Sequence, residues 1–135
     1  MSAAAVELQK GVFAALAGDA ELAALLGGAR VFDGPPRNAL PPYVHLGEAS
    51  VRDWSTGTED GFEVRFAVIA WSETAGRMQA LRLAERVRTV LADADLAPDG
   101  LRLVNLTHLG TETGRAEKPE GRRAVARFRA VVEVA

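Results

Sequence analysis

The chain has 135 residues, 48% of them hydrophobic and 25% charged, with a formal net charge of -2 and no cysteine. This composition is typical of an ordinary globular protein, so we expect a single domain over residues 1–135. The charge balance gives no electrostatic case for nucleic-acid binding, and the lack of cysteine excludes disulfides, thiol catalysis and cysteine-ligated zinc.

The N-terminal segment gives no sign of a membrane or secreted protein. An acidic residue, Glu7, comes before any long apolar run, which is unlike a secretory signal. No apolar stretch approaches the roughly 18 residues of a membrane-spanning helix. We therefore expect a cytoplasmic chain with no membrane contact.

Two helices are predicted at the start of the chain. Ser2 is a suitable N-cap for a helix over about residues 3–17, which ends at Gly18. Asp19 caps a short second helix over residues 20–26, closed by two glycines. The apolar positions of the first helix recur at helical spacing: Ala5, Leu8, Val12 and Leu16, with Phe13 on the flank.

A short strand, a stiff connector and a second strand come next. The segment "RVFDG" is predicted as a short strand, and "PPRNALPP" as a connector stiffened by its prolines. The segment "YVHLGEA" alternates, with Val44 and Leu46 on one side and Tyr43 and His45 on the other. The polar residues 50–61 that follow are expected to form a long loop.

The strongest strand signal, residues 61–71, is followed by a helix over about residues 75–93. The strand places Phe62, Val64, Phe66 and Val68 on one face, and both faces turn apolar from Ala67 onwards, as in a central strand. The helix carries an apolar stripe that predicts its buried face: Ala80, Leu83, Ala84, Val87, Val90 and Leu91.

Two strands complete the chain. Residues 101–109 alternate imperfectly, which indicates a bulge, and residues 110–121 read as a second long loop. Residues 122–134 alternate cleanly. The fold class is therefore α+β: a single mixed, largely antiparallel sheet of about four to five strands flanked by two main helices, in the order α-(short α)-β-β-β-α-β-β.

The helix over residues 75–93 has a consequence for the topology. At about 1.5 Å per residue it spans roughly 27 Å, enough to carry the chain back along the sheet. The strands before and after it would then run parallel. The two long loops would project from opposite ends of the molecule, which suits a part held between two partners.

Signals for an enzyme are weak. His45 and His108 lie on separate predicted strands without a second ligand at metal spacing. The glycine-rich residues 110–121 lack the phosphate-loop pattern and precede a strand. The acidic pairs Glu59–Asp60 and Asp93/Asp95 fit solvated surface. We expect no catalytic residue, no cofactor and no metal site.

Two features are candidates for contact with a partner. Arg123, Arg127 and Arg129 alternate with valines on one face of the last strand, as in an interface, although simple solvent exposure fits equally well. Trp54 lies in a polar loop, where its ring could be a local plug or an anchor for a partner.

Five segments taken in order carry a family resemblance. They are "VFDG", "PPYVHLGE", "DWST", the strand ending "AWS" before a helix rich in alanine and leucine, and "GRRAVARFRAVVEV". Together they resemble the tail-terminator (tail-completion) proteins of long-tailed phages and of gene transfer agents, over about residues 3–134.

That resemblance implies a structural role. Members form a hexameric ring that caps the finished tail tube and presents a surface to the head-side neck protein, and DNA crosses the channel without being read. It places the chain in the neck or tail of an assembled particle. The alternatives are another neck or head-completion part, or a small-molecule-binding α+β domain that uses the apolar strand ends as a pocket.

The resemblance also suggests which residues touch partners. Asp53 and Trp54 match the "DWST" loop of the family, while Arg115, Glu117 and Lys118 fall in the other long loop, the candidate contact with the tail tube. The face with Arg123, Arg127 and Arg129 would be either a subunit contact or a lining of the channel.

Overall fold

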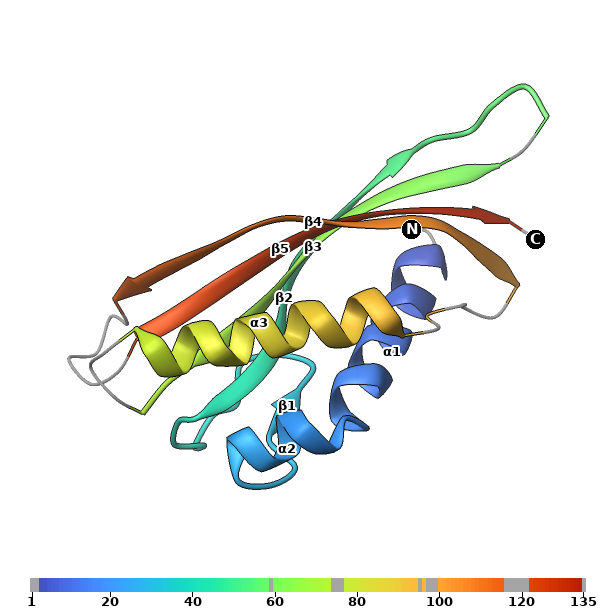
Figure 1. The fold of residues 1–135 in the computed structure, drawn as a ribbon. Helices are drawn as coiled ribbons and strands as arrows, with labels where there is room; N and C mark the ends of the chain where they lie inside the picture. The colour runs from blue at the N-terminus through green and yellow to red at the C-terminus, as the bar shows by residue number, and fades with distance from the viewer. Residues whose placement is uncertain are drawn as a thin grey trace.

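A computed structural model describes residues 3–58, 60–73, 77–94, 96, 100–115 and 122–134. The elements follow the predicted order (Figure 1): α1 (Ala3–Ala17), α2 (Ala20–Leu26), β1 (Val31–Phe32), β2 (Tyr43–Asp53), β3 (Gly61–Trp71), α3 (Met78–Asp93), β4 (Leu101–Arg115) and β5 (Arg122–Val134). No helix among these residues is long and apolar enough to cross a membrane.

The five strands form one mixed sheet in the order β1-β2-β3-β5-β4. The short β1 runs parallel to β2, and the other neighbours are antiparallel. The predicted α+β class is therefore confirmed. Because β3 and β4 are both antiparallel to β5, they run parallel to each other, as predicted, with β5 between them.

The sheet is long, and its two chain reversals lie far apart. Figure 1 shows the β2–β3 hairpin at one end of the sheet, while β4 ends and β5 begins at the other. The strand ends that flank the two loop regions therefore lie at opposite ends of the sheet, as expected. The separation follows from the parallel course of β3 and β4, since one hairpin precedes β3 and the other reversal follows β4.

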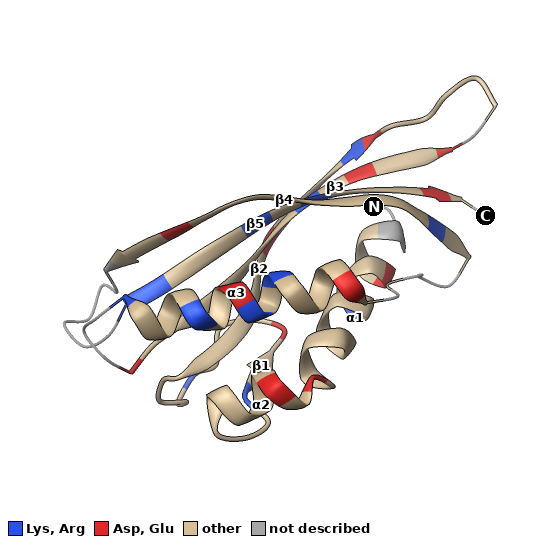
Figure 2. Cartoon of the chain, viewed as in Figure 1, with Lys and Arg blue, Asp and Glu red and all other residues tan. Residues whose placement is uncertain are grey.

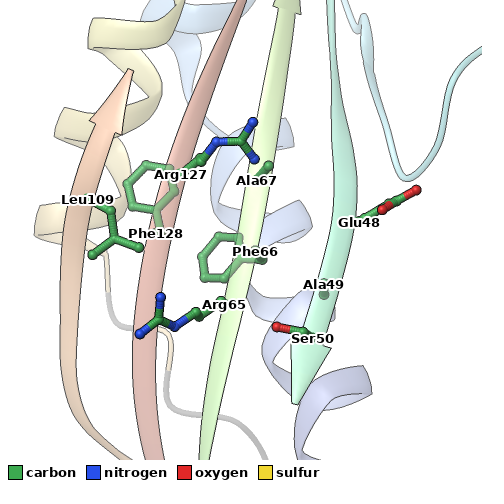
Figure 3. Close-up of a pocket in the computed structure, with 9 residues that line it drawn as sticks. All are labelled: Glu48, Ala49, Ser50, Arg65, Phe66, Ala67, Leu109, Arg127 and Phe128. Carbon is green, nitrogen blue, oxygen red and sulfur yellow. The ribbon is translucent and has the colours of Figure 1, made fainter. Parts of the chain in front are cut away.

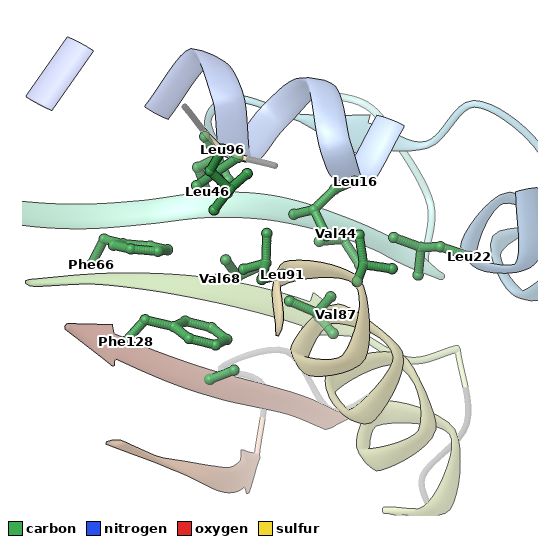
Figure 4. Close-up of a cluster of buried hydrophobic side chains, with 14 of the residues drawn as sticks. Leu16, Leu22, Val44, Leu46, Phe66, Val68, Val87, Leu91, Leu96 and Phe128 are labelled. Atoms are coloured by element: carbon green, nitrogen blue, oxygen red, sulfur yellow. The ribbon is translucent and has the colours of Figure 1, made fainter. Parts of the chain in front are cut away.

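The helices cover one face of the sheet. Cross-strand neighbours such as Leu46 and Val68, or Phe66 and Phe128, point to the same side and pack beneath α1 and α3 (Figure 4). The buried residues of α3 are the predicted apolar stripe: Ala80, Leu83, Ala84, Val87, Val90 and Leu91. The helical period of the sequence therefore predicted this face correctly.

The N-cap residue of α2 also connects α2 to α3. The Asp19 side chain accepts a hydrogen bond of 2.8 Å from the backbone N–H of Leu22, as expected for the N-cap of α2. The same carboxylate accepts from both Nε and Nη2 of Arg86 on α3, each at 2.8 Å. A single residue therefore caps one helix and joins it to another.

Two strands are longer than predicted, so the loop bounds were wrong. β2 continues to Asp53, with Ser50 opposite Arg65, and the first loop lies only between Asp53 and Gly61. β4 continues to Arg115, which pairs with Arg122 instead of lying in the second loop. Cross-strand hydrogen bonding holds these polar segments extended, although their local sequence carries no clear strand pattern.

Bulges interrupt two of the strands. The bulge predicted in the fourth strand is confirmed, and β4 has a second one: its register with β5 shifts between Leu103 and Asn105 and between His108 and Gly110. β2 contains a shift that the sequence did not predict, next to Gly47. A Cβ at Gly47 would lie 3.1 Å from Cδ1 of Ile69, so the close approach of the strands favours glycine there.

Candidate functional site

The face of the sheet opposite the helices carries a set of arginines. We call this the arginine face and define it by Arg65 on β3 and by Arg123, Arg127 and Arg129 on β5. The register sets Arg65 directly opposite Arg129, and pairs the other two with Trp71 and Ala67. Figure 2 shows the positive charge on β5. The alternation predicted for the last strand therefore does place Arg123, Arg127 and Arg129 on one surface.

Arg129 is held against the sheet by a buried carboxylate, and its side chain is 21% exposed. Glu63, only 4% exposed, accepts from Nε of Arg129 at 2.6 Å and from Nε of Arg65 at 3.2 Å. The hydrogen bond from Arg129 lowers the pKa of Glu63 below its usual value. The shared carboxylate thus offsets part of the repulsion between two like charges that lie opposite each other on neighbouring strands. Simple solvent exposure is therefore wrong for Arg129.

Arg129 also contacts Trp54, at the start of the turn between β2 and β3. The Arg129 guanidinium lies 5.0 Å from the ring centroid of Trp54, within the range of a cation–π contact. Half of the Trp54 side chain remains exposed. The ring therefore packs on its own sheet and still presents a free surface, so it combines features of both predicted roles.

Asp53 shapes the turn beside Trp54. Its carboxylate accepts from the backbone N–H of Ser55 at 3.0 Å and from the Ser55 hydroxyl at 2.6 Å, and the hydroxyl bond lowers the pKa of Asp53. The Ser55 hydroxyl in turn accepts from the N–H of Gly61 at 3.3 Å. These bonds close the base of the hairpin.

An aromatic cluster lies at the other end of the arginine face. Trp71 donates its Nε1–H to Nε2 of His45 at 3.0 Å, and Tyr43 lies 6.3 Å from the Trp71 ring. Arg123 stands over Trp71 with its guanidinium carbon 5.9 Å from the ring centroid. The two ends of this face therefore carry the same pairing of an arginine with a tryptophan, which the sequence analysis did not predict.

Both histidines make contacts within the chain. Because Nε2 of His45 accepts from Trp71, the proton lies on Nδ1, which donates to the Leu46 carbonyl at 3.0 Å. The side chain is 4% exposed. His108 contacts the Thr111 hydroxyl at 2.8 Å and packs against Phe128. Across the residues described, no group of three or more acidic or histidine side chains could hold a metal ion.

A shallow groove crosses the middle of the arginine face. Its volume is about 310 Å³, and Arg65 and Arg127 flank it in Figure 3 together with Leu109. Arg127 lies 3.5 Å from Glu112, and both side chains are largely exposed. The groove lies in the middle of the strands, between their two ends.

The candidate residues do not form a single site. Asp53 and Trp54 lie at the hairpin end of the sheet, and Arg115 ends β4 at the opposite end. Arg123 is exposed at the same end as Arg115, and Arg127 is exposed between the two ends. Glu117 and Lys118 lie outside the described residues, as do Glu59 and Asp95 of the acidic pairs. The arrangement is an extended surface with two ends.

The paired carboxylates predict sensitivity to acid. The hydrogen bond from Arg86 lowers the pKa of Asp19, and that from Arg129 lowers the pKa of Glu63. Each carboxylate therefore stabilises the fold at pH values above its unfolded pKa. This stability is lost as the pH falls through the folded pKa. We expect the urea midpoint to fall as the pH drops from 5 to about 3. The urea midpoint of the variant Glu63→Gln should fall less over this pH range than that of the unmodified chain. An equal fall of the midpoint in both would contradict the stabilising role of the ionised Glu63.

Comparison with known proteins adds two findings. The family described as "Tail completion protein gp17" matches residues 10–133. Among solved structures, 23 chains match. One is a chain of the "Virion of native gene transfer agent (GTA) particle", with 38% sequence identity and a TM-score of 0.87, and the match covers 98% of this chain and 99% of that one. No curated protein matches significantly.

Proposed function

Since the chain belongs to the tail completion protein gp17 family, we propose that it is the tail terminator of a phage-like particle, a ring that closes the tail tube and joins it to the head-side neck. The observation that carries this proposal is the match with a chain of a gene transfer agent virion over nearly the full length of both. The coarser role, a structural protein of a phage-like tail, rests on the same two comparisons.

The proposed ring is a homo-hexamer around a channel through which DNA passes without sequence-specific contact. The two ends of the sheet supply two separate surfaces, as a part between tube and neck requires. Asp53 and Trp54 at the hairpin end would meet one partner. Arg115, with Glu117 and Lys118 beyond the end of β4, would meet the tail tube at the other end. Assembly would take place in the cytoplasm before the protein joins the neck of the particle.

The chemistry of the described residues supports a structural role over an enzyme. The ring nitrogens of both histidines, and the ring face of His108, contact other groups of the same chain. The ion pairs of Asp19 and Glu63 join separate helices or strands of the fold. The arginine face instead combines guanidinium groups with aromatic rings, residue types that are enriched at protein interfaces. A surface of this kind fits assembly with other proteins of the particle.

The test is electron microscopy of particles from cells that lack this gene, scored for tail length and head attachment. We expect overlong or unattached tails beside DNA-filled heads, and a return to normal particles when the gene is restored. Tails of normal length with defective heads would favour the alternative of a neck or head-completion part. Normal particles in the absence of the gene would contradict both structural roles.

A further inference from the structure

β4 forms an open edge of the sheet along its whole length. It runs from Leu101 to Arg115, and within the described ranges its only strand partner is β5. An open edge presents unpaired backbone groups, and natural proteins usually protect such edges with prolines or lysines. β4 contains neither residue type. A strand of 15 residues left in this state is a template for pairing with another chain.

The bulges of β4 do not protect this edge in the usual way. The residues at the two register shifts are Val104 and Leu109, and each is 48% exposed. A bulge can by itself turn an edge away from a partner, but these two leave apolar side chains exposed to solvent and both lie before Gly110. Beyond the second bulge, six residues from Gly110 to Arg115 pair regularly with β5 and leave an uninterrupted outer edge.

A second open edge lies on the opposite side of the same sheet. β1 pairs with β2 only at Val44 and His45, so the rest of β2 has no strand on its outer side in the part of the chain that the structure describes. Figure 1 shows this part of β2 running out into the hairpin. Val51 within it is 38% exposed. The sheet therefore has two unpaired edges, one at each side.

The directions of these two edges are complementary. β2 is antiparallel to β3, β3 to β5, and β5 to β4, so β2 and β4 point in opposite directions. Placing the β4 edge of one copy beside the β2 edge of the next would thus continue the sheet in the antiparallel sense. Contact between two different surfaces is heterologous, and repeated contacts of this type close into a ring when the rotation allows it.

We infer that β4 of one copy pairs with the outer edge of β2, between Gly47 and Asp53, in the next copy. This inference rests on the proposed ring. The occupant is a second copy because one chain offers both edges in matching directions, and because pairing of β4 with another β4 would leave the β2 edge open. The arginine face would then continue from subunit to subunit.

Engineered cysteines test this pairing without interference, because the chain has no cysteine of its own. Ser50 on β2 is exposed on the arginine face, as are three positions on β4: Asn105, Thr107 and Glu112. Ser50→Cys is combined with a cysteine at each β4 position in turn. Within one chain, β2 and β4 are three strand spacings apart, about 14 Å, so a disulfide between these positions must join two chains.

The variants are produced in cells that lack the original gene, and purified particles are oxidised and separated on denaturing gels. A short cross-linker that spans about 7 Å, or about two residues along a strand, would also join cysteines that are not directly opposite each other. We expect at least one double variant to give a ladder of cross-linked multiples that ends at the closed ring. Each single-cysteine variant should remain monomeric, as should the control that pairs Ser50→Cys with Arg82→Cys on the exposed side of α3.

Three other results would overturn the inference. Dimers from Thr107→Cys alone would mean that β4 pairs with β4. A chain that is present in the particles but gives no ladder with any double variant would refute the edge pairing and leave the proposed function intact. Absence of the unmodified chain from purified particles would refute the proposed function, and the edge pairing with it.

Discussion

We expect Phe128→Ala to lower the free energy of unfolding by about 3–5 kcal/mol. The Phe128 side chain is 2% exposed and lies where β5 meets the core beneath the helices (Figure 4). Its ring stacks on Phe66 at 5.3 Å with an interplanar angle of 18°, and His108 lies 5.3 Å away on the other neighbouring strand. Truncation therefore leaves a cavity between three strands.

The loss is large compared with the total stability of a domain, which is typically about 5–15 kcal/mol. The measurement is the midpoint of urea unfolding for the purified chain. Leu81→Ala is the matched control, because this α3 side chain is 42% exposed, and we expect it to change the stability by no more than about 0.5 kcal/mol. Equal midpoints for the two variants would show that Phe128 does not support the core.

Arg129→Ala should destabilise the chain by more than the loss of an exposed ion pair, which typically contributes about 0.2–1 kcal/mol. The reason is the carboxylate of Glu63, which is 4% exposed and would keep only Arg65 as a charged partner. Removing one member of a buried pair leaves the other poorly compensated. The pKa of Glu63 should also rise, because the hydrogen bond from Arg129 is the main cause of its lowering.

The control for this variant comes from the same face of β5. Arg127 is 56% exposed and its partner Glu112 is 75% exposed, so Arg127→Ala should change the stability by no more than about 0.5 kcal/mol. Arg129→Ala should also make Trp54 easier to quench with acrylamide, since it removes the guanidinium over the ring. That readout is best made in a Trp71→Phe background. Equal losses of stability in the Arg129→Ala and Arg127→Ala variants would contradict the contacts assigned to Arg129.

Periodicity made the helix layer predictable. The stripe of α3 is buried at every predicted position, because an amphipathic helix repeats its buried face every 3.6 residues and needs no distant partner to define it. The clean alternation of β5 likewise predicted which side faces the core, with Ala126, Phe128 and Ala130 all buried. The order of five short motifs was enough to indicate the family, which the match over residues 10–133 confirmed.

The strand ends were not predictable in the same way. The residues from Ser50 to Asp53 have a single apolar member, Val51, and no alternating pattern, and they become strand because β3 lies beside them. Arg115 is extended because Arg122 lies opposite it. Backbone hydrogen bonds between strands depend on residues far away in the chain, so local side-chain patterns say little about where the pairing stops.

The sequence by itself determined the α+β class, the buried side of each main element and the separation of the two chain reversals, because these depend on local period and on strand direction. Only the tertiary structure decided the roles of the three arginines predicted on β5. Arg129 is bound by Glu63 and Trp54, which lie more than sixty residues earlier in the sequence, while Arg127 stays exposed. The sheet order also set β4 and β2 as open edges, since an edge is a property of the assembled sheet and not of any one segment.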